Sequence, residues 1–270
     1  MTDPVTLPEI AHAIRAAGLS NKVLALHSSI KSFGHLEGGP DTLIHAFMEA
    51  GCTLLVPAFT YACHVAPQRG IYLNGIDPAF VPDASRMVVE FDPECTLASP
   101  EMGSLPARIL QTAGRARGQH PLNSLTALGP HAKAIITEQG PLNVYGPYKW
   151  VYDRPPAFLV LLGVDLTKAT PIHFAEQRAG RRLFRRWGRE AGRIVESETG
   201  GCSEGFNRLL PCVETIEHKL FVGPSLWRIY PFRDFIDRVS AVIRTDPSIT
   251  HCDDAACVRC RDAGLGGPIL

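Results

Sequence analysis

The sequence lacks the features that would place it at once among membrane, secreted or nucleic-acid-binding proteins. Residues 1–10 (MTDPVTLPEI) have neither a basic n-region nor an apolar h-region. No apolar run approaches the roughly 20 residues of a membrane-spanning helix. Lys plus Arg and Asp plus Glu each number 27, which argues against non-specific nucleic-acid binding. We therefore expect a soluble, cytoplasmic protein without membrane or nucleic-acid partners, whose eight cysteines are thiols.

Standard nucleotide-binding and hydrolase motifs are missing as well. The chain contains no G-x-G-x-x-G fingerprint, no Walker A loop and no G-x-S-x-G nucleophile elbow. It also shows no internal repeat and no low-complexity linker. Hydrophobic residues nevertheless make up 45% of the 270 residues, enough for a sizeable core.

Apolar periodicity predicts alternating strands and helices. Strands are predicted at 23–27, 53–56, 157–164, 193–198, 219–222 and 225–229, and helices at 8–17, 41–51, 104–114, 130–139, 203–210 and 232–244. We take Asp41 and Ser104 as helix caps. This order predicts a layered α/β fold with a mixed sheet, forming a single domain over residues 1–270. The proline-rich stretch at about 61–100 is predicted to be a substrate-side excursion, and residues 251–270 form a cysteine-rich tail.

Residues 170–176 (TPIHFAE) follow the most apolar run of the chain, at 157–164 (AFLVLLGV). Pro171 suits the first turn of a helix, and Thr170 before it can act as the cap. His173 and Glu176 are three residues apart and so project from the same face of that turn. This pairing is typical of a general base with an orienting carboxylate. The alternative is a surface His–Glu pair without a catalytic role.

The segment 27–34 (HSSIKSFG) lies where a predicted strand opens into a loop before a helix. Exposed backbone N–H groups with Ser28, Ser29 and Ser32 can cradle a phosphate, and Lys31 adds positive charge. One of the first two serines could instead be a nucleophile with His173 as its base, because triads are defined by geometry. An ordinary polar turn is the third interpretation.

Two further segments carry polar side chains in suggestive patterns. Arg117 can bind a phosphate as a fork, and His120 and Ser124 follow it in an R-x-x-H-P-x-x-S loop. The alternative for His120 is a loop histidine whose hydrogen bonds are satisfied within the protein.

The tail supplies three potential zinc ligands, Cys252, Cys257 and Cys260. A structural zinc site needs four ligands, and the fourth would have to be His251, awkwardly adjacent to Cys252. Inert or oxidisable thiols are the alternative interpretation. We therefore assign no metal site from the sequence.

Taken together, several segments resemble the aminoglycoside 3-N-acetyltransferase family. They are HSSIKSFG with Gly38-Gly39, TLLVPAFTY at 53–61, Met102-Gly103, RGQHPLNSLTALG at 117–129, FLVLLGV and TPIHFAE. They occur in the family's order and span roughly residues 23–244. The resemblance implies a three-layer α/β/α fold with a mixed central sheet, and acetyl-CoA as co-substrate. It implies a small-molecule amine as the other partner, and it is compatible with a homodimer.

The resemblance also assigns roles to individual residues. The residues that match the family's catalytic segment are His173, Glu176 and Thr170. Those that match its CoA-binding segments are Ser28, Ser29, Ile30, Lys31, Ser32, Gly103, Arg117, His120 and Ser124. The implied activity is acetyl transfer from acetyl-CoA to an amine of an aminoglycoside-like antibiotic, a resistance activity. The alternatives are N-acyl transfer to a biosynthetic amine, a serine-nucleophile enzyme, and a non-catalytic CoA-binding protein.

The charges near the predicted catalytic helix bear on the acceptor. Aminoglycosides are polycations, and the excursion offers acidic residues to receive them, at Asp77, Asp83, Glu90, Asp92, Glu94 and Glu101. A basic run follows the helix, at Arg178, Arg181, Arg182, Arg185 and Arg186. This run is either a solvated helix face or a sign that the acceptor is an anionic amine.

Overall fold

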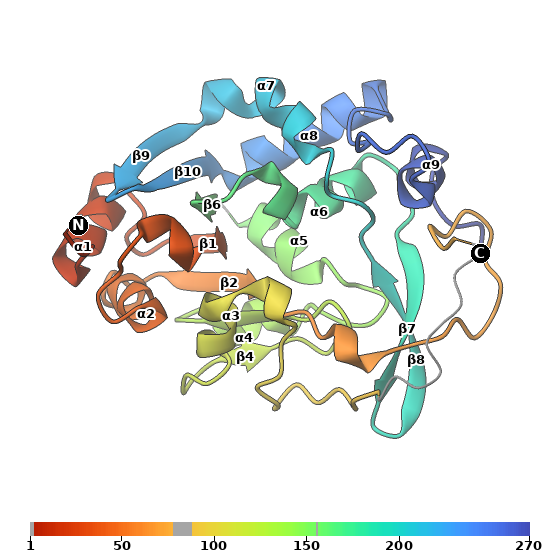
Figure 1. The fold of residues 1–270 in the computed structure, drawn as a ribbon, viewed down its shortest axis with the longest axis horizontal. Coiled ribbons are helices and arrows are strands. Elements are labelled where there is room, and N and C mark those ends of the chain that lie inside the picture. The colour runs from red at the N-terminus through yellow and green to blue at the C-terminus, as the bar shows by residue number, and fades with distance from the viewer. Residues whose placement is uncertain (1–2, 78–87, 155) are drawn as a thin grey trace.

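The computed structural model describes residues 3–77, 88–154 and 156–270, which form a central sheet flanked by helices and a second, smaller sheet to one side (Figure 1). The strands are β1 (Val23–Ser28), β2 (Thr53–Pro57), β3 (His64–Val65), β4 (Ala116–Arg117), β5 (Leu125–Leu128), β6 (Ala157–Leu162), β7 (Phe184–Glu190), β8 (Arg193–Thr199), β9 (His218–Val222) and β10 (Ser225–Pro231). The helices are α1 (Leu7–Ala16), α2 (Pro40–Glu49), α3 (Ser104–Ile109), α4 (Ala132–Ile136), α5 (Gly146–Asp153), α6 (Pro171–Arg178), α7 (Leu210–Val213), α8 (Phe232–Thr245) and α9 (Val258–Gly264). Short 3-10 turns are η1 (Ile30–Phe33), η2 (Tyr61–Cys63), η3 (Pro100–Met102), η4 (Leu166–Lys168), η5 (Phe206–Leu209) and η6 (Glu214–Ile216).

The central sheet is mixed. Its strands are ordered β4-β5-β2-β1-β6-β10-β9. The three strands β2, β1 and β6 run parallel to one another, and the strands on either side join them antiparallel. Because β1 lies at the centre, the loop that leaves its carboxyl end emerges in the middle of the sheet edge.

Side chains on β1 and β6 alternate between two cores, which makes the fold three-layered. Ala25 and Leu159 belong to the core shared with α4, α5, α6 and α8. Leu24 and Val160 belong to the opposite core, formed with α1, α2 and α3. A strand reverses its side chains at each residue, so a run that is apolar throughout must be buried on both faces. The predicted three-layer α/β/α fold with a mixed sheet is confirmed.

A second, three-stranded sheet in the order β3-β7-β8 stands beside the main one (Figure 1). Strand β7 comes from the basic run, one interpretation of which was a solvated helix face. The helix ends instead at Arg178, and Gly180 has a φ of 104° that a helix cannot continue through. Residues 184–190 pair with β8 along their whole length, which makes them a strand.

The helix caps differ from those predicted. Gly39 and not Asp41 occupies the N-cap of α2, and Gly103 and not Ser104 that of α3. The helix predicted at 203–210 begins as the 3-10 turn η5 and continues as α7. The elements additional to those predicted are strands β3, β4, β5 and β7 and helices α5 and α9. Among the described residues, no helix combines the length and apolar character needed to cross a bilayer.

Candidate active site

Two cavities adjoin at the carboxyl edge of the central sheet. The first, the histidine cavity, has a volume of about 510 Å³ and is lined by His173. The second, the serine-loop cavity, has a volume of about 470 Å³ and is lined by the residues that follow β1. The two share a wall made of Phe59, Glu101, Met102, Lys168 and Thr170. Two ligands of small-molecule size can therefore meet across this shared wall.

The serine-loop cavity contains most of the predicted cofactor-binding residues. Ser28 ends β1, and its neighbours continue into η1. The predicted residues on its wall are Ser28, Ser29, Ile30, Lys31 and Gly103. Ser32 is not on the wall: its hydroxyl donates to the Ser29 carbonyl at 2.7 Å and lies 2.7 Å from Ser225 Oγ. Ser32 therefore holds the loop against β10 rather than facing the cavity.

His173 and Glu176 form a buried pair on the first turns of α6. Nδ1 of His173 lies 2.6 Å from Oε2 of Glu176, and the two residues are 8% and 6% exposed. Because a carboxylate only accepts hydrogen bonds, this contact places the imidazole proton on Nδ1. In the neutral tautomer of this ring, which lines the histidine cavity, Nε2 is then the nitrogen without a proton. The interpretation as a surface pair is wrong for this structure, since both side chains are buried.

Arg181 fixes the other end of the Glu176 carboxylate. Its Nη1 donates to Oε1 of Glu176 and, at 2.8 Å, to the hydroxyl of Thr250. Its Nη2 donates to the Pro247 carbonyl. Arg181 is 8% exposed, so this guanidinium is a buried partner and not part of a solvated helix face. A buried carboxylate needs such a countercharge to remain ionised.

Aromatic rings and a glycine hold the imidazole in place. Tyr145 stacks on His173 with ring centroids 6.3 Å apart, and Phe206 meets it edge-on at 5.0 Å. The backbone of Gly200 closes over the ring. A Cβ at position 200 would lie 2.5 Å from Cδ2 and Cγ of His173, nearer than carbon atoms approach without repulsion. Nothing in the sequence singles out Gly200 or Arg181, because both contacts are made across the fold.

Thr170 occupies the N-cap position of α6 but does not cap it. Its φ and ψ of −49° and −33° are already helical, and its side chain makes no capping hydrogen bond. The predicted cap is therefore wrong. The side chain lies instead beside the buried Tyr148 hydroxyl, on the wall that both cavities share. Thr170 thus lies on the boundary between the two cavities.

The predicted cofactor residues Arg117, His120 and Ser124 are buried behind the cavities. Arg117 donates to the Ser124 hydroxyl at 3.0 Å and to the Ala58 carbonyl at 2.8 Å. His120 Nδ1 accepts from the Asn123 N–H at 2.8 Å, so Nε2 carries the proton and donates to the Glu198 carbonyl at 2.9 Å. Desolvation lowers the pKa of His120 to about 4. These side chains are satisfied within the protein and line neither cavity.

The histidine cavity carries charges of both signs. Glu101 and Glu204 line it together with Lys168, Arg186 and Arg259. Burial, with a smaller effect from the positive charge of Arg259, lowers the pKa of Arg186 to about 10. Arg186 remains a cation at neutral pH because that value still lies well above 7. The wall therefore offers both anionic and cationic contacts.

Most acidic residues of the excursion do not line the histidine cavity. Glu90 lies 3.7 Å from Arg189, and Glu94 lies 3.9 Å from Arg115. Asp83 is outside the described residues, and neither Asp77 nor Asp92 is on the cavity wall. Of the excursion acids that the structure describes, only Glu101 lines the cavity. Of the acidic residues that this stretch was expected to offer to a polycationic acceptor, Glu101 is therefore the one on the cavity wall.

Comparisons with known proteins agree with this architecture. A model of the family described as aminoglycoside 3-N-acetyltransferase matches residues 25–220. Aminoglycoside N(3)-acetyltransferase III from Salmonella sp. is 30% identical over 175 residues, covering 63% of this chain and 60% of that protein. The chain thus spans about 60% of the length of this curated relative.

Solved structures show the same fold over nearly the whole chain. The apoenzyme of aminoglycoside acetyltransferase AAC(3)-IVa superposes with a TM-score of 0.78 at 25% identity, covering 98% of this chain and 99% of that one. AAC-IIIb in its binary complex with CoASH gives a TM-score of 0.74 at 23% identity, covering 90% and 97%. The family match includes the serine loop, the shared wall and the His173–Glu176 pair. The chain belongs to the aminoglycoside 3-N-acetyltransferase family.

Proposed function

We propose that this protein transfers the acetyl group of acetyl-CoA to an amine of an aminoglycoside-like antibiotic. The observation that carries the proposal is the buried His173–Glu176 pair beside a wall shared by two cavities. Family membership supports the reaction class, because the curated relative is named an aminoglycoside N(3)-acetyltransferase. Acetyl transfer needs two substrates side by side and a base beside the acceptor, and two adjoining cavities with His173 on the wall of one of them fit this need.

The serine-loop cavity is our candidate for the acetyl-CoA site. Its wall at the end of β1 contains two serine hydroxyls and Lys31, groups suited to phosphate and amide oxygens. The complex of AAC-IIIb with CoASH supports a CoA ligand for the family. Arg117, His120 and Ser124 would act indirectly, by fixing the loop whose Asn123 and Leu122 line the other cavity.

His173 would act as the general base. The acceptor amine must be neutral when it attacks the thioester carbonyl, because a protonated amine has no free electron pair. Nε2 of His173 takes the proton that the nitrogen loses as the new N–C bond forms. The tetrahedral intermediate then collapses, the C–S bond breaks, and CoA leaves as a thiolate that receives a proton. Glu176 and Arg181 keep the imidazole in the required tautomer and orientation.

Thr170 would contribute to the oxyanion site. Its side chain caps no backbone group of α6 and lies on the wall between the cavities. A donor at this position can stabilise the negative charge that develops on the thioester oxygen. The backbone N–H groups of Ile30 and Lys31 are the other candidates for this role, because those of Ser29 and Ser32 donate to the Leu162 and Ser29 carbonyls.

The proposal is tested by following CoA thiol release from acetyl-CoA in the presence of aminoglycosides such as gentamicin and apramycin. The wild-type protein is expected to acetylate at least one of them, and His173→Ala to lose a factor of about 10² to 10⁴ in kcat/KM. His45→Ala is a matched control, since it removes an exposed His–Glu pair with a 3.2 Å contact on α2. A folded His173→Ala variant with wild-type turnover would refute the assignment of the base.

The direct-transfer mechanism has its own test. Among the described residues, no hydrogen bond joins Ser28 or Ser29 to His173, and these serines line the other cavity. We therefore infer attack by the amine on the thioester without an acyl-enzyme intermediate. Mass spectrometry after incubation with acetyl-CoA alone is expected to show unmodified protein. A stoichiometric acetyl adduct on either serine would favour the serine-nucleophile mechanism instead.

An anionic amine is the second candidate acceptor. It is favoured by the cations Lys168, Arg186 and Arg259 on the cavity wall, against the two carboxylates of Glu101 and Glu204. An amine that also bears a carboxylate or phosphate would pair with these guanidinium groups. A panel containing both amine classes separates the two candidates: kcat/KM is highest for the polycations under the first and for the anionic amines under the second.

A further inference from the structure

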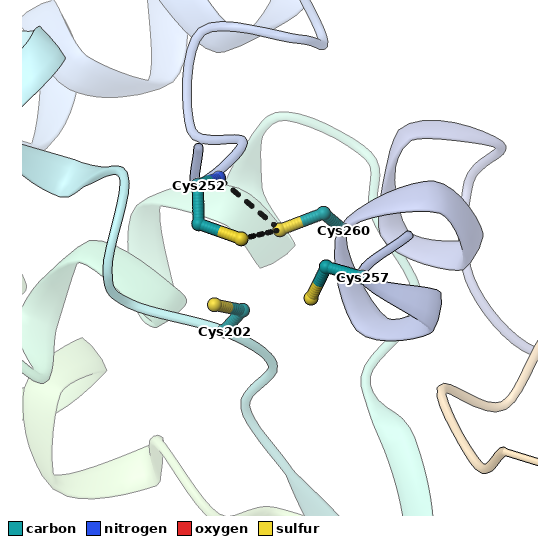
Figure 2. A group of neighbouring side chains, drawn as sticks. All are labelled: Cys202, Cys252, Cys257 and Cys260. Atoms are coloured by element: carbon teal, nitrogen blue, oxygen red, sulfur yellow. Dashed lines mark hydrogen bonds between the residues drawn. The ribbon is translucent and has the colours of Figure 1, made fainter. Parts of the chain in front are cut away.

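Four cysteine side chains from two distant parts of the chain meet in one place. Cys202 comes from the loop after β8, and the other three from the tail, around the start of α9 (Figure 2). All four sulfur atoms lie within 4.8 Å of one another, and those of Cys252 and Cys260 are 3.5 Å apart. His251, the only fourth ligand that the sequence analysis considers within the tail, is not in this group. The fold supplies Cys202 instead, 50 positions before Cys252.

The spacing of the sulfur atoms fits a single tetrahedral metal ion. With zinc–sulfur bonds of about 2.3 Å, the sulfur atoms of a tetrahedral site are about 3.8 Å apart. The 3.5 Å between Cys252 and Cys260 is close to this value and no pair is more than 4.8 Å apart, whereas a disulfide would bring two sulfur atoms to about 2.05 Å. All four cysteines are free thiols in the structure. A tetrahedral set of four sulfur ligands is typical of zinc.

The backbone around the cluster donates hydrogen bonds to the sulfur atoms. The Cys252 N–H lies 3.3 Å from Sγ of Cys260. The N–H groups of Glu204 and Cys260 also contact Sγ of Cys202 and Cys257 respectively. Such N–H···S contacts orient metal-bound thiolates and spread their negative charge. They are the surroundings that sulfur ligands need, not those of an apolar core.

The tail has little else to fold around. Within residues 246–270, Cys260 and Pro268 are the buried apolar residues, Ile249 packs partly buried against the main core, and Leu265, Ile269 and Leu270 are exposed. The remaining attachments are polar, such as the Gly75 N–H to Asp262 Oδ2 at 2.8 Å. Small segments that bury so little apolar surface are usually held by a disulfide or a metal ion. A metal cross-link accounts for the ordered path of this tail.

We propose that Cys202, Cys252, Cys257 and Cys260 bind one zinc ion in a structural site. Four protein ligands leave no open position for water or substrate, so the ion would fold the chain rather than take part in catalysis. Binding converts four thiols into thiolates and releases four protons to solvent. The site is independent of the proposed acetyl transfer and stands if that proposal fails.

Zinc at this position would also stabilise the wall of the histidine cavity. Cys202 is two residues from Gly200, whose backbone packs on His173, and both line the cavity. Arg259, between Cys257 and Cys260, lines it as well. The ion would thus join the tail to the loop that covers the candidate base. Its loss is expected to loosen this wall, in addition to releasing the tail.

Elemental analysis of the full-length protein, purified without chelators, tests the proposal directly. We expect one zinc per chain in the wild type, and less than about a tenth of an ion in Cys257→Ser. Cys212→Ser, a change outside the cluster, is expected to retain the zinc, and so is His251→Ala. Cys202→Ser is expected to lose the zinc. Loss of zinc in Cys202→Ser but not in His251→Ala would identify Cys202, and not His251, as the fourth ligand.

A second measurement keeps the test decisive if a cysteine variant does not fold. Wild-type protein freed of metal is titrated with Co²⁺, which in a tetrahedral four-thiolate site gives intense sulfur-to-cobalt charge-transfer bands that saturate at one equivalent. Limited proteolysis is expected to cleave residues 246–270 rapidly in the metal-free protein and slowly after zinc is added. Metal-free wild-type protein that binds no Co²⁺, stoichiometric iron, or a native disulfide within the cluster would each overturn the zinc assignment.

Discussion

Replacing Gly200 with alanine tests how closely the candidate base must be held. The added Cβ would lie 2.5 Å from two ring carbons of His173 and 2.7 Å from the hydroxyl of Tyr145. Non-bonded carbon atoms prefer about 3.5 Å or more, so the ring or the loop must move by about 1 Å. The ring cannot move that far and keep its 2.6 Å contact with Glu176. A displacement of this size typically costs about 10² in rate.

The assay compares kcat/KM for acetyl transfer in the wild type, Gly200→Ala and the control Gly70→Ala. A Cβ at position 70 would meet no heavy atom within 4 Å, and Gly70 lies on the exposed excursion, so its replacement is expected to leave turnover unchanged. Overpacking at position 200 is also expected to cost about 1–3 kcal/mol of stability, to be read from denaturant unfolding. A folded Gly200→Ala variant within about twofold of the wild-type kcat/KM would contradict the proposed role of the ring position.

Two further predictions concern the buried ionisable groups. Glu176→Gln is expected to lower kcat/KM by about 10² to 10⁴, or roughly 2.7–5.4 kcal/mol, because the amide no longer selects the imidazole tautomer and Arg181 loses its countercharge. Steady-state rates measured at a temperature where the variant is folded check this prediction. An unchanged rate would contradict it. His120 has a folded pKa of about 4 against 6.5 for the free side chain, so the unfolded state binds this proton first as the pH falls. Stability is therefore fully present above pH 6.5 and declines towards pH 4, with a contribution from this group on the order of 3 kcal/mol. Denaturant unfolding at several pH values is expected to show that the free energy of unfolding falls less steeply with decreasing pH in His120→Gln than in the wild type. Equal slopes for the two proteins would argue against this contribution of His120.

The layers of the fold follow from local sequence patterns. Residues 157–162 are apolar throughout, and this alone requires burial on both faces of a sheet. The spacing of Phe232, Phe235, Ile236 and Val239 likewise predicts helix α8 from its apolar stripe. Strand β7 was not predictable in the same way, because its residues do not alternate between buried and exposed and because the partners of Arg185 and Arg186 lie elsewhere in the chain. The local pattern was overridden there by tertiary contacts.

The candidate site also contains some contacts that a local sequence pattern predicts and others that depend on the tertiary fold. The pairing of His173 with Glu176 is a contact within one helix, and the three-residue spacing is enough to predict it. Arg181, Gly200 and Cys202 act through contacts across the fold, and their sequence neighbourhoods carry no signal for them. The R-x-x-H-P-x-x-S loop shows the opposite case, in which a polar motif proved to be an internal hydrogen-bond network.

The wall shared by the two cavities has a consequence for ligand design. In the proposed arrangement each substrate has its own cavity, and the cavities share Thr170, Lys168 and Met102 in their walls. A single molecule that joins an amine-bearing ring to a CoA-like arm would pass through this junction and occupy both at once. Because the second half then binds intramolecularly, its effective concentration reaches the millimolar range with a short linker. Such a bridged ligand would hold the protein more tightly than either half, and the best linker length would report how far apart the reacting atoms lie.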